Sequence, residues 1–310
     1  MNKFRYTVAY VLALLVALFG VAPAFASMTS SNYQILWDTV GVGGDSTSSS
    51  SSYKLRDVLG ENAADMSTST NYTLAGGFRG GTYDKTVDFR VLGMGRSYQV
   101  GATSVASTTV TVTTTSGYAA GSFIVLIQDE GSAQVSAMGK LTTVTATTLT
   151  VDAWTTNGTS PAIDGSDDVV YLMTTAPDIE LGTLNTSDIS TFVLGWQAAA
   201  DVSQGYSVYL MADHGLQSTV SASTVITAVS DGAVTVGVTE YGARSSDTSL
   251  ALSTFDTADT AITTSLQQVA SRGDNAIRSR DFLTLKAAIA TGTTSAEYTQ
   301  ALTLIFVGDY

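Results

Sequence analysis

The stretch Phe123-Ile124-Val125-Leu126-Ile127 is a continuous apolar run, and Gly121 and Gly131 lie on either side of it. A short apolar run between such turn residues is typical of a β-strand that is buried on both faces. Glycines at those positions favour tight turns before and after the strand. The run therefore predicts a strand inside a β domain, and the sequence around it predicts that strand's neighbours.

Three further segments in the middle of the chain have strand patterns. Val110-Thr111-Val112 and Leu149-Thr150-Val151 alternate, and Val169-Val170-Tyr171-Leu172-Met173 closes the series. Valine and threonine favour strands because their branched β-carbons suit a pleated surface. Strands at this spacing, without helical periodicity, predict a small β sandwich or barrel over residues 91–175.

Residues 177–310 predict a second β domain. Phe192-Val193-Leu194-Gly195-Trp196 opens it, and Tyr206, Val208 and Leu210 form one face of the next strand. The spacing of these segments fits an immunoglobulin-like sandwich. Three more strands and a short helix are expected further along. The strands are Val234 to Val238, Phe282 to Ile289 and Tyr298 to Val307, and the helix is Thr264 to Ala270.

Residues 27–85 carry one short phrase three times. The copies are Tyr33-Gln34-Ile35, Tyr53-Lys54-Leu55 and Tyr72-Thr73-Leu74. Residues two apart lie on the same side of a strand, and the small polar residues between copies suit turns. The region therefore predicts ordered strand repeats, with Ser48 to Ser52 as a hinge.

The first 26 residues have the pattern of an export signal. Lys3 and Arg5 form a basic start, Val8 to Val21 is an apolar run, and Ala24-Phe25-Ala26 offers a cleavage site with small residues. The apolar run is short for a bilayer span of about 20 residues, so we expect cleavage rather than anchoring. The sequence predicts a secreted, extracellular or cell-surface protein with no membrane segment in the mature chain.

The composition excludes several functions. The net charge is −13, and the signal segment contains two of the 14 basic residues and none of the 27 acidic ones, so the mature chain is more acidic still. Such a surface repels phosphate backbones, which argues against nucleic-acid binding. The chain has no cysteine, which excludes disulfides and thiol chemistry. A hydrophobic content of 44% is too high for a disordered chain.

Several short phrases lie along the chain outside residues 91–175. They are the repeated Tyr-x-Leu phrases closing on Gly77-Phe78, then Leu181-Gly182-Thr183-Leu184, Gly205-Tyr206-Ser207-Val208, Glu240-Tyr241-Gly242 and a final strand from Tyr298 to Thr303. Together they resemble a group of secreted, largely uncharacterised surface proteins of ultrasmall candidate-phyla bacteria. The resemblance covers the first and third regions and implies that 91–175 is an inserted domain. It implies a role at the envelope surface or in an appendage, and it brings no catalytic residues.

No residue pattern indicates an enzyme or a cofactor. The single histidine, His214, follows Asp213 in an expected turn, and no Gly-x-Ser-x-Gly elbow is present to position a nucleophile. Asp164, Asp167 and Asp168 could offer oxygens to calcium, but they lack the spacing of an EF-hand loop. We therefore assign no catalytic, cofactor or metal residue, and leave calcium at this cluster open.

Two functions fit an exported β protein without catalytic groups. The first is a structural subunit of a filament, pilus or surface layer that self-associates into polymers. In that case Tyr33, Ile35 and Trp37 lie on one face of a strand donated to a neighbour's open edge, or serve as an ordinary strand of their own chain. The second is an adhesin or carbohydrate-binding module that contacts surface protein or glycan. Trp154 and Tyr118 are its candidate sugar-stacking residues, with core packing as their other interpretation.

Overall fold

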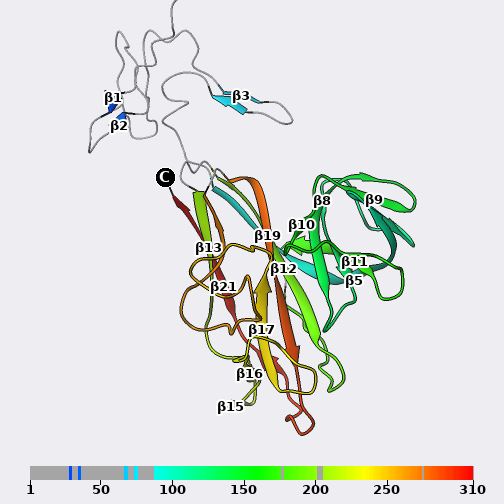
Figure 1. Cartoon of the computed structure of the whole chain (residues 1–310), viewed down its shortest axis with the longest axis vertical. Helices are drawn as coiled ribbons and strands as arrows, with labels where there is room; N and C mark the ends of the chain where they lie inside the picture. Colours follow the sequence, from blue (N-terminus) through cyan, green and yellow to red (C-terminus); the bar gives the residue numbers. More distant parts are fainter. Residues whose placement is uncertain are drawn as a thin grey trace, which may run out of the picture. The chain divides into compact units, whose positions relative to one another are not determined.

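The structure is all-β, as the sequence predicted. The computed structural model describes residues 87–175, 178–200, 205–273 and 276–309, together with the backbone of four short strands between residues 28 and 75 (Figure 1). In these residues every regular element is a strand. None of them belongs to a helix long and apolar enough to span a membrane. The chain divides into two units, Met1–Asp84 and Lys85–Tyr310.

The first unit contains two short antiparallel pairs. Strand β1 (Met28–Thr29) pairs with β2 (Gln34–Ile35), and β3 (Met66–Thr68) pairs with β4 (Thr73–Ala75). Strands β2 and β4 coincide with the first and third Tyr-x-Leu phrases. The second phrase and the serine-rich hinge lie outside the described residues.

Six strands of the second unit close into a barrel. Hydrogen-bonded neighbours run β5–β6–β9–β8–β7–β11, and β11 pairs again with β5, so the ring is complete. A closed ring of this kind leaves no free strand edge inside the barrel wall. The strands are β5 (Val87–Ala106), β6 (Thr109–Val112), β7 (Phe123–Gln128), β8 (Val135–Val144), β9 (Thr148–Val151) and β11 (Val169–Thr175), with β10 (Thr155–Thr156) added beside β8.

Strand β7 is buried on both faces, which confirms the prediction from its apolar run. Ile124 and Leu126 belong to the core inside the barrel, together with residues of the other five strands. Phe123, Val125 and Ile127 belong instead to the core of the neighbouring sandwich. Since successive side chains point to opposite faces of a strand, β7 contributes to both cores at once.

The remaining strands form a sandwich next to the barrel. One sheet has the order β5–β12–β19–β17–β16, and the facing sheet has the order β18–β13–β21. A third, small sheet contains β14, β15 and β20. The strands are β12 (Ser190–Ala200), β13 (Gly205–Ala212), β14 (Gln217–Ser218), β15 (Ser221–Val225), β16 (Thr227–Ala228), β17 (Glu240–Ser245), β18 (Gln267–Arg272), β19 (Ala276–Ala288), β20 (Tyr298–Thr299) and β21 (Leu302–Asp309).

The sandwich core is built from alternating residues of both sheets. Tyr206, Val208 and Leu210 of β13 are each at most 1% exposed, as their alternation predicted. They face Leu194 and Trp196 of β12 in the same hydrophobic cluster. Strands β12, β13 and β19 thus confirm three of the predicted segments, whereas the predicted strand Tyr298 to Val307 divides into β20 and β21, which belong to different sheets.

The barrel and the sandwich share strand β5. Residues Val87 to Gly93 of β5 pair with β12, and the part from Leu92 onward pairs with β11. The two parts also approach closely at Gly195, where an added Cβ would lie 2.6 Å from the sulfur of Met138 in β8. A side chain at this position would have to displace the flexible ends of Met138 and Met173, so glycine lets the two parts pack closely.

The predicted helix at Thr264 to Ala270 is wrong. The segment enters β18, whose residues pair with β13 from Tyr206 to Leu210. Val269 and Ala270 are fully buried in the sandwich core. A short segment has little helical stability of its own, so pairing with a neighbouring strand decides its conformation.

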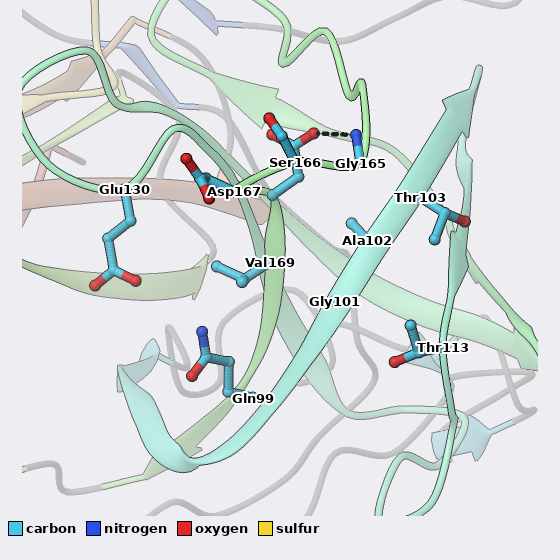
Figure 2. Close-up of a pocket in the computed structure, with 11 residues that line it drawn as sticks. Gln99, Gly101, Ala102, Thr103, Thr113, Glu130, Gly165, Ser166, Asp167 and Val169 are labelled. Carbon is cyan, nitrogen blue, oxygen red and sulfur yellow. Dashed lines mark hydrogen bonds between the residues drawn. The ribbon is translucent and has the colours of Figure 1, made fainter.

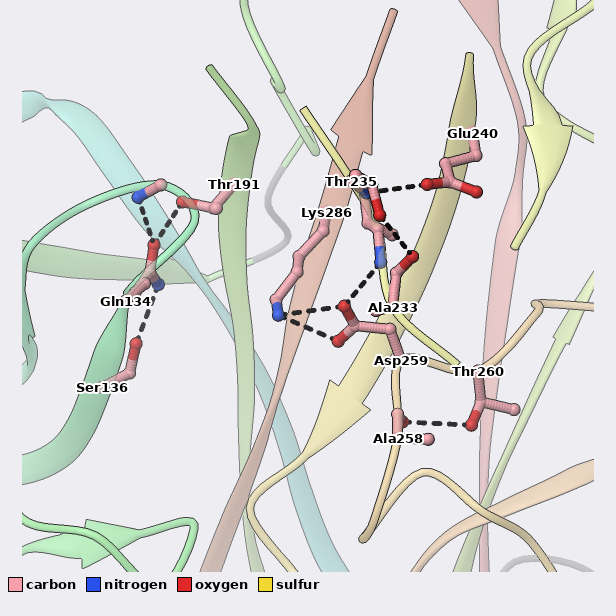
Figure 3. A network of polar contacts seen from close by, with 12 residues as sticks. Gln134, Ser136, Thr191, Ala233, Thr235, Glu240, Ala258, Asp259, Thr260 and Lys286 are labelled. Atoms are coloured by element: carbon pink, nitrogen blue, oxygen red, sulfur yellow. Dashed lines mark hydrogen bonds and ion pairs between the residues drawn. The ribbon is translucent and has the colours of Figure 1, made fainter. Parts of the chain in front are cut away.

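The predicted strand at Val234 to Val238 is also wrong, because this segment is a loop (Figure 3). Asp259 Oδ2 accepts a hydrogen bond from the Val234 amide at 2.9 Å, and Glu240 Oε1 accepts one from the Thr235 amide at 2.7 Å. The Asp259 carboxylate also contacts Lys286 Nζ at 2.9 Å. Side chains therefore satisfy backbone donors that a sheet would otherwise pair.

Candidate functional site

The sheet β18–β13–β21 has two edges, and the β18 edge is covered. Side chains from the end of β17 and from the segment between β17 and β18 form hydrogen bonds with its outward backbone groups. These contacts stop another strand from pairing there. They are Ser245 Oγ to Val269 O at 2.6 Å, Ser253 Oγ to Gln268 O at 2.6 Å and the Ser271 amide to Asp247 Oδ2 at 2.8 Å.

At the opposite edge of this sheet, β21 has no second neighbouring strand among the described residues. Just before the strand, the Asp213 amide donates to Ala301 O at 3.1 Å. Because paired and unpaired residues alternate in an antiparallel ladder, the N–H and C=O groups of Leu302, Leu304 and Phe306 point away from β13. In the described part of the chain, β13 is the one strand that pairs with β21, and no side chain bonds to the β21 backbone.

The side chains of β21 are apolar and incompletely covered. Leu302, Leu304 and Phe306 pack against the sandwich core but remain half-buried. On the other face, Ile305 is half-buried and Val307 is 42% exposed. An edge strand of this kind, with unpaired backbone groups and apolar side chains, is a template for another strand.

The facing sheet ends on the same side. Phe306 of β21 lies over Phe89 of β5, with ring centroids 5.5 Å apart. Among the described residues, Val87 to Val91 pair only with β12, since β11 joins β5 from Leu92 onward. We call β21 together with Val87–Val91 the open edge. It is one side of the sandwich at which both sheets lack a further strand, and Figure 1 shows β13 and β21 side by side there.

The predicted assembly residues lie in the other unit. Ile35 belongs to β2, which pairs with Met28–Thr29. Tyr33 and Trp37 lie outside the described residues.

The acidic loop considered for calcium turns its carboxylates toward its own backbone. Asp168 Oδ2 accepts hydrogen bonds from the amides of Asp164 at 2.7 Å and Gly165 at 2.8 Å. Asp164 Oδ1 accepts from the Ser166 amide at 2.9 Å and the Ser166 hydroxyl at 2.8 Å, and these bonds lower the pKa of Asp164. The loop is thus a hydrogen-bonded turn.

A hollow of about 520 Å³ lies beside this loop and is lined by Asp167 and Glu130 (Figure 2). Glu130 is already paired, with Oε1 3.2 Å from Arg96 Nη1 and Oε2 accepting from the Tyr171 hydroxyl at 2.6 Å. Figure 2 shows that the carboxylates of Glu130 and Asp167 do not converge on one point. In the described residues, no three acidic or histidine side chains are arranged to hold a metal ion.

His214 lies in a turn, as predicted. Its Nδ1 is 2.7 Å from Gly215 O, and its Nε2 is 3.3 Å from Asp213 Oδ2. The Ala301 amide, bonded to the Asp213 carboxylate, is the main cause of a lowered pKa for that group. In the described residues no hydroxyl group bonds to the imidazole, so the arrangement lacks the nucleophile of a triad.

The two aromatic residues considered for sugar stacking pack against the barrel. Tyr118 belongs to the barrel core, and burial raises the pKa of its hydroxyl, which lies 2.9 Å from the carbonyl oxygens of Tyr98 and Val170. Trp154 is half-buried against the same core and donates from Nε1 to Ser107 O at 3.0 Å. The core interpretation therefore holds for Tyr118, whose ring offers no face to a sugar.

Comparison with known proteins finds no family model, no curated protein and no solved structure that matches this chain. The open edge is therefore the feature of the described residues from which a function is best argued. Sequence patterns predicted β21 as a strand but contained no signal for its place at the border of the sheet.

Proposed function

We propose that the mature chain is a non-catalytic structural subunit of a surface filament, pilus or layer, whose copies associate through the open edge. The contrast between the two edges of the sheet β18–β13–β21 carries this proposal. Soluble proteins usually blunt an edge with charges, proline or a covering segment. Leu302–Gly308 of β21 contains no charge or proline, Asp309 at its end is its one charged residue, and no segment of the described residues covers the strand.

Strand β21 provides both features that the addition of another strand requires, namely unpaired backbone groups and apolar side chains. Its outward backbone groups supply a ladder of hydrogen bonds, and its half-buried side chains supply apolar contacts for every second residue of the added strand. The resemblance to secreted surface proteins and the export signal support a location outside the cell. An assembly of this kind requires no catalytic group.

The location is tested by the amino terminus of the exported protein. We expect mass spectrometry to find Ser27 as the first residue, because Ala24 and Ala26 form the best-placed pair of small residues after the apolar run. An exported product that retains residues 1–26 contradicts the expected cleavage.

The interface is tested by a charge on the open edge. Val307→Lys is expected to raise the concentration for half-assembly at least about tenfold, because a lysine on an edge strand opposes pairing and removes apolar contact. The matched control is Val225→Lys, since Val225 of β15 is 43% exposed and Val307 is 42% exposed. Sedimentation and electron microscopy of the mature proteins measure the effect, and both variants should unfold at the wild-type temperature.

A second variant blocks the backbone rather than the side-chain surface. Leu302→Pro removes an N–H that points away from β13, so the ladder within the subunit keeps its bonds while an added strand loses one. Assembly of both β21 variants at the wild-type concentration contradicts the proposal. So does a wild-type protein that stays monomeric at high concentration; monomers that bind glycans would favour an adhesin instead.

A further inference from the structure

We infer that the open edge is completed by the strand Tyr33–Trp37 of a second copy of this chain. This inference rests on the proposed function, because it names the partner of the same surface. The acceptor lies in the described part of the chain, and the donor is the strand that the sequence predicts near the mature amino terminus.

The backbone of the open edge sets the length and direction of the contact. Leu302, Leu304 and Phe306 each direct an N–H and a C=O outward, so β21 offers these groups at every second residue. A strand rises about 3.4 Å per residue, so a five-residue donor covers about 17 Å. The eight-residue strand β21 therefore accommodates the whole of Tyr33–Trp37.

The side chains of the donor match both faces of the open edge. Tyr33, Ile35 and Trp37 project to one side of an extended strand and would extend the half-buried apolar surface around Phe89 and Phe306. Large aromatic and aliphatic groups are suited to cover such a surface, since they remove the most apolar area from water.

The opposite face of the donor also matches the side chains of β21 that it would lie beside. Leu36 projects to the side on which Ile305 and Val307 of β21 lie partly exposed. The donor Tyr33-Gln34-Ile35-Leu36-Trp37 contains no charged residue, and neither does β21 before Asp309. Pairing the donor with β21 therefore buries no charged side chain of either strand, which avoids a large desolvation cost.

The donor belongs to another copy because the proposed function joins copies through this edge, where β21 pairs only with β13 among the described residues. About 50 residues connect Trp37 to the start of β5, which is long enough to reach a neighbouring subunit.

The absence of cysteine makes a direct test possible, because any introduced thiol is the only one in its chain. A Leu36→Cys protein is mixed with Thr303→Cys, Ile305→Cys or Val307→Cys protein under mild oxidation. Facing residues of adjacent strands have Cβ atoms about 5 Å apart, close enough for a disulfide. We expect at least one mixture to form mostly the mixed disulfide dimer, and Leu36→Cys with the exposed control Ser223→Cys to form none.

The alternatives give different products. Homodimers of Ile305→Cys alone would show that two β21 strands pair with each other, which overturns the donor but keeps the open edge as the interface. An intramolecular disulfide in dilute Leu36→Cys/Ile305→Cys double variant, with no mixed dimer, would show that the strand returns to its own chain. Polymers that persist unchanged after deletion of residues 27–38 would also overturn the donor, and the Val307→Lys result decides separately whether the interface itself stands.

Discussion

Replacing Gly205 with alanine is expected to lower the free energy of unfolding of the mature protein by at least about 3 kcal/mol. Gly205 begins β13 with a φ of +98°, a conformation that residues with a side chain rarely adopt. An added Cβ would lie within 1.9 Å of the carbonyl oxygen of Arg272 and 2.9 Å from Gly273 Cα. Both contacts involve backbone, so relief requires β13 and β18 to separate at this end.

The control for this substitution is Gly215→Ala. Gly215 lies in the turn after β13, has no left-handed φ, and an added Cβ there meets nothing within 4 Å. Urea unfolding followed by intrinsic fluorescence measures both variants. We expect Gly215→Ala to stay within about 0.5 kcal/mol of wild type, as surface substitutions usually do. Equal stabilities for the two variants would contradict the close approach at Gly205.

This substitution also bears on assembly. Gly205 is paired with Asp309, so it aligns β13 with the last residue of the open edge. Gly205→Ala protein that stays folded but has a displaced β13 is expected to assemble only at higher concentration, because the register of β21 depends on its pairing with β13. Polymer yield for Gly205→Ala should therefore fall together with the unfolding free energy.

The second large effect is a dependence of stability on pH that originates at Asp281. This aspartate is fully buried on β19, with Oδ1 2.6 Å from Arg272 Nη2 and 3.2 Å from the Ser246 hydroxyl. Its Oδ2 is buried and has no hydrogen-bond partner among the described residues. Burial raises the pKa of Asp281 to about 6, and the nearby Asp247 adds to this, while Arg272 opposes it.

The direction of the effect follows from the proton balance. Between pH 4 and 6 the folded protein keeps a proton on Asp281 that the unfolded chain, with a pKa near the ordinary 3.8, releases. The contribution of protonated Asp281 to the free energy of unfolding is therefore complete below pH 3.8 and is lost as the pH rises through 6. A difference of about two units corresponds to about 3 kcal/mol.

Thermal unfolding between pH 4.5 and 7.5 measures this contribution. We expect the melting temperature of the wild type to fall as the pH rises through 6, and Asp281→Asn to lack that fall because it has no carboxyl group to ionise. Asp88→Asn, at an exposed position of β5, is the control and should follow the wild type. Parallel pH profiles for the wild type and Asp281→Asn would contradict this prediction, because they would show that the pKa of Asp281 is the same in the folded and unfolded states.

Local patterns predicted several strands correctly but missed others, including β5 and β8 of the barrel. The apolar run at Phe123 to Ile127 predicted burial on both faces, and alternation predicted the buried face of β13. These predictions succeed because burial on one face or two determines the order of apolar and polar residues along a strand. The same kind of pattern gave a wrong prediction at Val234 to Val238, where Asp259 and Glu240 hold the backbone in a loop. The prediction was also wrong at Thr264 to Ala270, where pairing with β13 overrides a weak local preference.

The all-β class, the lack of disulfides, the excess of acidic residues and a strand over most of Leu302 to Val307 could be predicted from the sequence alone. Each depends on composition or on side chains close together in the chain. The three-dimensional arrangement was needed to show that six strands close into a barrel and that Ser245 and Ser253 cap β18. It also showed that, among the described residues, β21 has β13 as its one neighbour. The position of a strand within its sheet depends on partners distant in sequence, and its own residues are the same at an edge or in the middle. The open edge is therefore a property of the arrangement of strands, and no local pattern contains it.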